Sequence, residues 1–475
     1  MIDTKNMTNF EVQGQQLVDK YQIPGTALGI AQDGKLAYAN GFGYANVEGK
    51  KPVTMDTVFG IASVTKSFTC VAIMQLQEAG KLSVHDPIVK YLDNFKTPSE
   101  QTDKMTIHHF MTHSAGIPPL PTLVYANKRS FDEDPSVDDY PGLKINEEEE
   151  QGPIDTYDEL LDFIGKLDYK LLGEPGTEFS YSNDSYALLG AIIEKVSGKP
   201  YEQYIKDHIL TPANMEHSCC KIEDLEDYDN ITSLYATKEG EHGEEVYEAP
   251  VWWHSPAMLA AGYLKSTVND MLNYAEIFRN EGKVGDVQIL SPESVKAMVT
   301  PHIECAPGKY YGYGLMITPD YYGGTLVEHG GNLKAISSLL AIVPERGVTG
   351  MVLTNLAGVP ATTLLSGALN VYEGRDFDAS QLPTDDYAYT SEALKEFEGQ
   401  YVSNEGMSLD VNSKGSHLEF TVPGLTIPVK SVGQDLFLAT IKDQTELIRF
   451  VRDEAGEIYR VAYHLRQFPK VSSNN

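Results

Sequence analysis

Ser63 and Lys66 are the residues of this chain whose types and spacing most directly suggest covalent chemistry. Residues three apart on a helix project from one face, so a helix that begins near Ser63 would hold the lysine ammonium beside the serine hydroxyl. A free serine is a weak nucleophile, and a neighbouring base or a charge that lowers its pKa activates it. The apolar run from Phe68 to Leu76 predicts a buried, rigid helix for this purpose. Alone, however, a Ser-x-x-Lys pattern is more often a helix cap followed by a solvated lysine.

Two further motifs favour the catalytic interpretation. Tyr181-Ser182-Asn183 follows a turn-like Pro-Gly pair, and His329-Gly330-Gly331 follows a strand-like apolar stretch. Penicillin-recognising enzymes carry Ser-x-x-Lys, Ser-Asp-Asn and Lys-Thr-Gly in this order. With Tyr-x-Asn and His-x-Gly as variants of the second and third motifs, the chain resembles the β-lactamase-related serine hydrolase family, in the branch of class C β-lactamases, D-peptidases and esterases. The resemblance covers about residues 10–373.

The expected mechanism begins with attack of the Ser63 hydroxyl on a carbonyl group to form an acyl-enzyme. Lys66 lowers the cost of forming the alkoxide, and Tyr181 relays the proton, with its pKa lowered by the nearby ammonium group. Asn183 orients Lys66 or holds the substrate amide. His329 replaces the lysine usual in the third motif, either as a structural hydrogen-bonding group or as a group that tunes the local charge.

The substrate is expected to lie along the strand of the third motif. Gly330 and Gly331 have no side chains, so a substrate can add there like a further β-strand. The backbone N–H groups of Ser63 and Asn332 are expected to form the oxyanion hole. No metal ion and no organic cofactor is required.

Composition excludes several classes of partner. The net charge of −31, from 68 acidic and 37 basic residues, argues against nucleic acids and anionic membranes, because phosphates would be repelled. No apolar stretch is long enough for a transmembrane helix, and the first residues lack the features of a signal peptide. Four cysteines without metal-ligand spacing suggest reduced thiols, so we expect a cytoplasmic protein.

Some segments allow two interpretations. The acidic stretches 132–150 and 216–248 are expected to be solvated loops, or a rim over the pocket, rather than calcium sites. The histidines at 108, 109 and 113 lack partners at metal-ligand spacing. Trp252-Trp253 either lines the substrate pocket or packs in the core.

The predicted architecture is an α/β (α+β) domain with an antiparallel sheet flanked by helices, in residues 1–373. Its first and last strands are expected to pair. Residues 374–391 form a polar linker, and residues 392–475 contain seven or eight short strands of an all-β barrel. This barrel resembles the lipocalin-like C-terminal domain of archaeal-type serine peptidases, and we expect it to be a packed module for stability or assembly. Expected helices cover 9–21, 63–79, 156–166, 185–197, 268–279 and 361–372, and expected strands of the first domain cover 26–32, 36–41, 325–328, 336–343 and 347–354.

Three classes of function follow from the resemblance. The first is a peptidase for short peptides, including peptides with D-residues. The second is a carboxylesterase or weak β-lactamase, which shares the acylation step. The third is a non-enzymatic, filament-forming protein, against which the three intact motifs argue. The barrel favours the peptidase, and the expected partners are a small-molecule or short-peptide substrate and further copies of the chain in a homo-oligomer.

Overall fold

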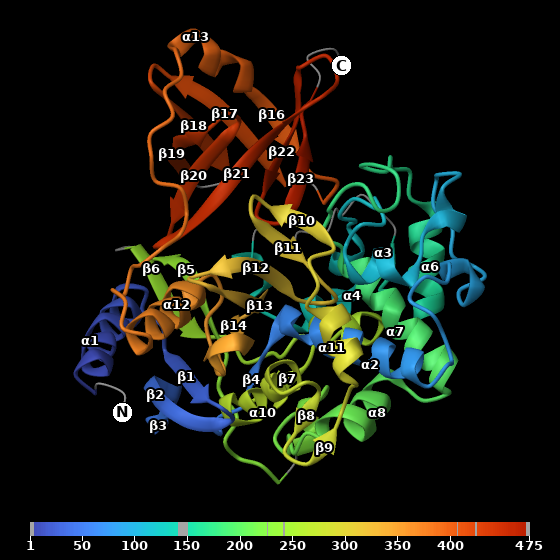
Figure 1. Ribbon diagram of the computed structural model, residues 1–475, viewed down its shortest axis with the longest axis vertical. Helices are drawn as coiled ribbons and strands as arrows, with labels where there is room; N and C mark the ends of the chain where they lie inside the picture. Colours follow the sequence, from blue (N-terminus) through green and yellow to red (C-terminus); the bar gives the residue numbers. More distant parts are fainter. Residues whose placement is uncertain are drawn as a thin grey trace.

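The computed structural model describes residues 4–140, 151–225, 227–240, 243–405, 407–422 and 425–471 (Figure 1). Two large sheets organise the chain. One sheet of nine strands lies among helices, and a second sheet of eight strands stands above it at the top of Figure 1. Within the described residues, no helix is both long and apolar enough to span a bilayer.

The nine-stranded sheet is antiparallel throughout and confirms the expected fold class. Its first strand pairs with its last in sequence, with Thr26 opposite Thr354, as predicted. Both strands lie in the middle of the sheet, so distant parts of the chain form its centre. In spatial order the strands are β10 (Ile303–Ala306), β11 (Lys309–Tyr311), β12 (Met316–Tyr321), β13 (Gly324–Leu333), β14 (Ile336–Val343), β15 (Val348–Thr354), β1 (Gly25–Gln32), β2 (Lys35–Asn46) and β3 (Lys51–Pro52).

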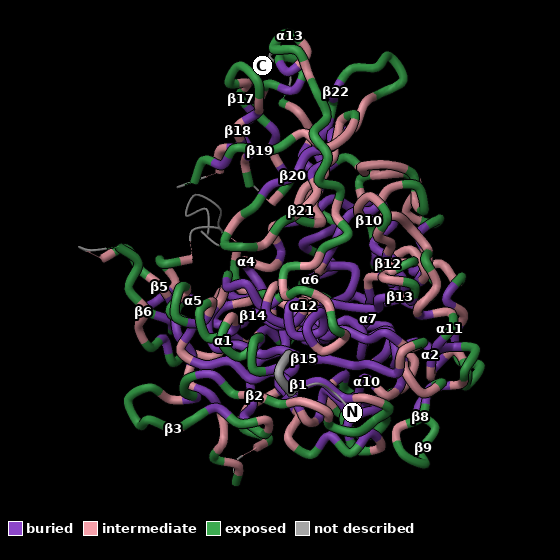
Figure 2. Tube along the Cα trace, turned by 60° about the vertical axis from the view of Figure 1, so that its left-hand side comes forward, coloured by how far each residue is buried: buried purple, intermediate pink, exposed green. Residues whose placement is uncertain are grey.

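Helices cover both faces of this sheet, as the alternation of side chains along a strand requires. Leu28 and Ile30 of β1 belong to the apolar cluster under α1 (Thr4–Lys20) and α12 (Ala361–Tyr372). On the other face lies α10 (Val268–Arg279), which approaches so closely that a Cβ on Gly29 would come within 2.6 Å of Val268. The central strands are therefore buried on both sides (Figure 2).

A helical cluster lies beside the sheet and carries two of the three motifs. Its centre is α2 (Thr65–Glu78), preceded by the 3-10 turn η1 (Ala62–Val64), and α7 (Asn183–Ser197) packs on it. The surrounding helices are α3 (Ile107–Met111), α4 (Thr122–Ala126), α5 (Lys128–Glu133), α6 (Tyr157–Lys166), α8 (Tyr201–Ile205), α9 (Leu259–Gly262) and α11 (Pro292–Met298).

Three small hairpins or strand pairs complete this part: β4 (Phe59–Gly60) with β7 (Lys265–Ser266), β5 (Tyr235–Gly240) with β6 (Gly243–Glu248), and β8 (Lys283–Val284) with β9 (Val287–Gln288). The second acidic stretch, 216–248, is therefore partly a hairpin rather than only a loop. In the first acidic stretch, residues 141–150 lie outside the described residues.

The C-terminal sheet is an antiparallel meander that closes almost completely into a barrel. Its last strand returns to its first, because Tyr401 bridges Lys470 and the Val471 N–H donates to the Gln400 carbonyl at 2.8 Å. Aromatic side chains, including Phe397, Phe437 and Phe450, pack in its interior. The strands are β16 (Gly399–Val402), β17 (Ser408–Lys414), β18 (His417–Val422), β19 (Leu425–Gly433), β20 (Leu436–Ile441), β21 (Gln444–Arg452), β22 (Ile458–Tyr463) and β23 (Arg466–Pro469), with the short helix α13 (Ser391–Leu394) before them.

Candidate active site

Ser63 and Lys66 lie where the 3-10 turn η1 meets helix α2, and the lysine reaches the serine as expected. Lys66 Nζ is 3.2 Å from Ser63 Oγ, 2.8 Å from Asn183 Oδ1 and 2.6 Å from the carbonyl oxygen of Ala261. The residue before the serine, Ala62, has a left-handed backbone with φ of 45°. Such a conformation is costly for a residue with a side chain and typically occurs at functional sites. The turn presents Ser63 partly exposed while its neighbours are buried.

Burial controls the charge of Lys66. The side chain is fully buried, and its pKa lies well below 10.5, chiefly because burial disfavours the ammonium form and then because Arg466 is nearby. A neutral amine can donate its two N–H groups to Asn183 and Ala261 and accept the Ser63 proton with its lone pair. The geometry thus suits Lys66 as a general base.

Tyr181 and Asn183 lie at the start of helix α7, opposite Ser63. The Ser182 hydroxyl accepts the Ser185 N–H at 3.1 Å and caps this helix. The Ser182 N–H in turn donates to His113 Nδ1 at 3.0 Å, and the His113 ring lies 4.2 Å from the Tyr181 ring. His113 therefore holds the second motif in place through its ring nitrogen and its contact with the Tyr181 ring.

The state of Tyr181 differs from the expectation. Burial raises its pKa to about 12, although the Ser63 hydroxyl and Arg466 act in the opposite direction. The prediction that nearby cations lower this pKa is wrong here, because desolvation of the phenolate outweighs them. Tyr181 is thus a protonated phenol. The centre of its ring lies 4.7 Å from Lys66 Nζ.

His329 lies in the same buried group and is neutral. Burial lowers its pKa to about 3. Its Nδ1 lies 2.6 Å from the Gly330 carbonyl, to which it donates, so its Nε2 accepts a hydrogen bond from the Tyr311 hydroxyl at 2.9 Å. The geometry matches a structural hydrogen-bonding role, and Tyr311 is a site residue that sequence reasoning did not find. In the sequence, Tyr311 is only a tyrosine eighteen residues before His329, and nothing distinguishes it from the other tyrosines among the 28 of the chain.

The third motif lies inside strand β13, and one edge of this part of the strand is free among the described residues. Strand β12 pairs with β13 from Gly324 only as far as Glu328, whereas β14 pairs with it to Leu333. At Gly331 the strand passes so close to η1 that a Cβ would lie 2.3 Å from the Ile61 carbonyl. Asn332, expected to supply an oxyanion-hole N–H, is exposed just beyond it.

The barrel also reaches this site, which the sequence did not indicate. The turn between β22 and β23 places Leu465 against the cluster of Phe179, Tyr181 and Tyr311. The guanidinium of Arg466 lies over the Tyr181 ring, with 4.9 Å between Cζ and the ring centre. Its Nε donates to Glu405 at 3.1 Å. Strand β22 ends at Tyr463, and the turn at His464 and Leu465 leads into β23, which begins with Arg466.

Other candidates have structural roles. His108 contacts the Tyr313 hydroxyl at 2.8 Å, and His109 caps its own helix. Trp253 is a core residue that donates to Asp134 at 2.7 Å. Within the described residues, no group of His, Cys, Asp and Glu side chains could hold a metal ion. All four cysteines are buried and free.

The fold and the arrangement around Ser63 define a serine hydrolase of the β-lactamase and penicillin-binding-protein type. The chain belongs to the beta-lactamase family, whose sequence model, described as "Beta-lactamase", matches residues 14–368.

Individual relatives are similar over different lengths. "Penicillin-binding protein 4*" of Bacillus subtilis (strain 168) is 24% identical over 429 residues, covering 88% of this chain and 87% of that protein. "Protein flp" of Staphylococcus aureus (strain MW2) is 27% identical over 355 residues, 71% of this chain, and the match spans only 61% of flp.

Two solved structures match nearly the whole chain. The octameric penicillin-binding protein homologue from Pyrococcus abyssi has a TM-score of 0.69 at 30% identity, covering 99% of this chain and 100% of that chain. SurE has a TM-score of 0.69 at 23% identity, covering 98% and 100%. At that identity SurE supports the fold alone.

Proposed function

We propose that this chain is a serine peptidase that acts on short peptides with a free carboxylate. The observation that carries the proposal is the free edge of β13 from His329 to Leu333, beside Ser63. A peptide in extended conformation can pair with such an edge through its backbone, whereas a small ester or lactam uses little of it. The edge therefore favours a peptide substrate over the alternatives that share the acylation chemistry.

The proposed reaction has two halves. In the first, neutral Lys66 takes the proton of the Ser63 hydroxyl as its oxygen attacks the peptide carbonyl carbon, and the C–N bond breaks. The leaving amine takes a proton from the Tyr181 hydroxyl, which Lys66 restores. In the second half, water attacks the acyl-enzyme, and its proton passes back through the same groups, so that Ser63 regains its hydroxyl. The backbone N–H groups of Ser63 and Asn332 stabilise the oxyanion in both halves.

Arg466 supports a carboxylate-bearing substrate. Its Nε is engaged by Glu405, which leaves its two terminal nitrogens, as far as the described residues go, for a ligand. A guanidinium pairs with a carboxylate through two parallel hydrogen bonds. Because Arg466 and Leu465 close one side of the site, they limit the length of substrate beyond the scissile bond, so the proposed substrates are short.

Two further features of the proposal come from relatives. SurE, whose fold this chain shares, has a crystal structure with D-Leu, and on this ground we include a preference for D-residues. The Pyrococcus abyssi homologue is octameric, and we propose that this chain also assembles into a homo-oligomer. Light scattering of the purified protein tests the assembly, and a monomer at all concentrations contradicts it.

The activity is tested with matched substrates and a serine-directed phosphonate. We expect the phosphonate to add at Ser63, and Ser63→Ala to abolish turnover. Dipeptides with a free carboxylate should be cleaved faster than their C-terminal amides, and the D- and L-forms are compared within each pair. The proposal fails if short esters or a chromogenic cephalosporin are turned over while the dipeptides are not, which would indicate an esterase or β-lactamase. Absence of both labelling and turnover would indicate a non-enzymatic protein.

A further inference from the structure

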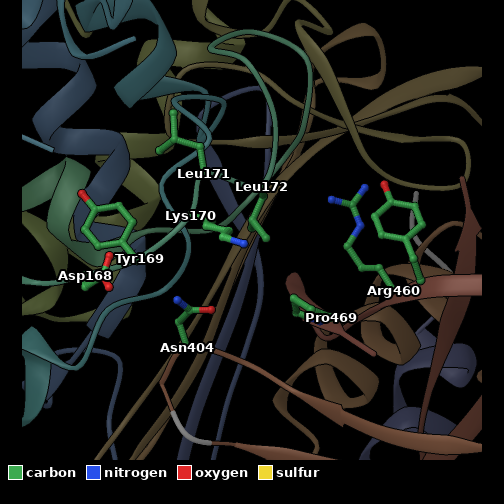
Figure 3. A pocket seen from close by; sticks show the side chains of 9 residues that line it. Asp168, Tyr169, Lys170, Leu171, Leu172, Asn404, Arg460 and Pro469 are labelled. Atoms are coloured by element: carbon green, nitrogen blue, oxygen red, sulfur yellow. The ribbon is translucent and has the colours of Figure 1, made fainter. Parts of the chain in front are cut away.

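A cavity of about 500 Å³ lies where the barrel meets the catalytic part of the chain (Figure 3). On one side the loop 168–172 lines it, and on the other side Asn404, Tyr459, Arg460 and Pro469 of the barrel line it. None of the residues grouped around Ser63 belongs to this lining. The cavity is therefore distinct from the candidate active site, although both border the segment that runs from Leu172 to Tyr181.

Arg460 is the most unusual residue of this cavity. Its side chain is only 2% exposed, yet among the described residues only Nη2 has a hydrogen-bond partner, Glu178 Oε2 at 2.8 Å. Nε and Nη1 are buried without a described partner. Unsatisfied buried N–H groups of a charged side chain are costly, and a bound acceptor removes that cost. Nε and Nη1 lie on different sides of the guanidinium, so each offers an N–H to a separate acceptor oxygen, and a carboxylate is a strong acceptor for such a group.

The other side chains indicate what kind of acceptor fits. In Figure 3 the guanidinium of Arg460 and the ammonium of Lys170 point toward one another across the cavity. The Asp168 carboxylate lies to the far side, next to Tyr169. Two facing cations favour an anion between them, and Glu178 offsets only one of the two charges. Leu171, Leu172 and Pro469 supply apolar walls that an inorganic anion would not use.

We propose that this cavity binds a small organic carboxylate with an apolar body. The carboxylate accepts from Nη1 of Arg460, the Lys170 ammonium adds attraction, and the body packs against the leucines and Pro469. Since Arg460 belongs to the barrel and Lys170 to the catalytic part, the bound ligand joins the two. It therefore raises the unfolding temperature of the chain, because a ligand that binds only the folded state stabilises it.

The probe for this site is 4-methylpentanoate, with 4-methylpentanamide as its uncharged counterpart. Titration calorimetry and thermal unfolding are carried out on the full chain carrying Ser63→Ala, so that no turnover intervenes. We expect saturable binding of the acid with a rise in unfolding temperature. The amide should bind about 10- to 100-fold more weakly, the factor typical of losing charged hydrogen bonds. Inorganic phosphate, which lacks the apolar body, should bind more weakly than the acid.

Variants locate the binding. Arg460→Gln should weaken acid binding about 10- to 100-fold. The matched control is Arg449→Gln, because Arg449 also donates from the barrel to the catalytic part, to Glu304 at 2.8 Å, but does not line the cavity. That control and Arg466→Met, which alters the candidate active site, should keep the affinity. If Arg460→Gln does not fold, Lys170→Met replaces it, because Lys170 is exposed and its loss leaves the fold intact; it should weaken binding several-fold.

The proposal is overturned by any of three results: no binding of the acid at millimolar concentration, equal binding of acid and amide, or unchanged affinity in both Arg460→Gln and Lys170→Met. Loss of binding in Arg466→Met but not in Arg460→Gln would also overturn it, since the acid would then occupy the active site.

Discussion

Lys66 makes its three polar contacts with a hydroxyl, an amide oxygen and a backbone carbonyl, and none of these carries a full charge. A buried ammonium without a carboxylate at hydrogen-bonding distance is poorly stabilised, so the neutral amine is favoured. Burial disfavours the Tyr181 phenolate more than Ser63 and Arg466 stabilise it, so Tyr181 stays protonated. The two residues thus divide the work, with the lysine as the base and the tyrosine as a proton donor.

Replacing Tyr181 with Phe should therefore reduce kcat about 10²- to 10⁴-fold while the protein stays folded, since the ring remains and only the hydroxyl is lost. Steady-state kinetics and circular dichroism measure the two effects. Labelling of Ser63 by the phosphonate should persist, because Lys66 remains as the base. Turnover close to that of the unaltered protein would assign the whole proton transfer to Lys66.

Asp184, next to Asn183, makes stability depend on pH. Burial raises its pKa to about 7, although Thr122 donates a hydrogen bond to it. In the unfolded chain it ionises near 3.8. The folded protein therefore holds an extra proton between these values, and its free energy of unfolding falls as the pH rises from about 4 to about 7.

Asp184→Asn cannot ionise, so the variant should lose less stability over this interval, by about 2–4 kcal/mol. Urea unfolding at a series of pH values measures the difference. Asp229→Asn is the control, because its side chain is 98% exposed. Parallel curves for the unaltered protein and Asp184→Asn would contradict the expectation.

At the scale of elements, strand β13 packs against the turn η1 so closely that the contact requires a glycine. A Cβ at Gly331 would lie 2.3 Å from the Ile61 carbonyl, while at Gly330 its nearest neighbour would be 3.6 Å away. The two glycines of the motif therefore have different roles: Gly331 permits the close approach, whereas a Cβ at Gly330 would make only ordinary van der Waals contacts.

Gly331→Ala should cost about 1–3 kcal/mol of stability and most of the activity, because strand and turn must separate and Ser63 moves with the turn. Gly330→Ala, the matched variant, should keep the unfolding temperature. Thermal unfolding and phosphonate labelling of both variants distinguish them. Equal effects in the pair would show that contact with η1 is not what the motif requires.

The sequence predicted the secondary-structure elements well and the contacts between distant elements poorly. The motifs at Ser63 and Asn183 and the pairing of β1 with β15 follow from local patterns and from the family resemblance. The turn at His464 and Leu465 does not, since both residues have left-handed backbones with φ of 50° and 60° and neither is a usual turn residue. The alternation of apolar and polar residues runs through His464 and Leu465, so the sequence pattern alone predicts a continuous strand there. The contact of Leu465 with Tyr181 depends on packing between distant segments, which no local pattern encodes.

At the scale of the molecule, this contact changes the role expected for the barrel. The sequence predicts that residues 392–475 are only a packed module for stability or assembly. Arg466 lies over the Tyr181 ring, and it is the second cause, after burial, of the lowered pKa of Lys66. We therefore propose that the barrel is also part of the catalytic unit. The division at 374–391 remains a proposal about independent folding.

Arg466→Met tests this role through pH. Loss of the positive charge should raise the pKa of Lys66, so the rise of kcat/KM with pH should move to higher pH, because Lys66 must be neutral to act as the base. The activity against carboxylate-bearing dipeptides should also fall about 10- to 100-fold relative to their amides. Arg449→Met, which removes another barrel arginine at the interface, should show neither effect. A lower plateau with an unmoved pH profile would indicate a merely structural role.

The position of Arg466 in the last strand of the barrel has a consequence for biosynthesis. Almost the whole chain separates it from Ser63, so a polypeptide still on the ribosome carries the nucleophile long before it carries the arginine. Strand β23 both closes the barrel and brings Arg466 to Tyr181. On the proposal that the barrel belongs to the catalytic unit, the site around Ser63 is complete only after β23 has been synthesised and has folded, and a shorter nascent chain holds its serine in an incomplete site.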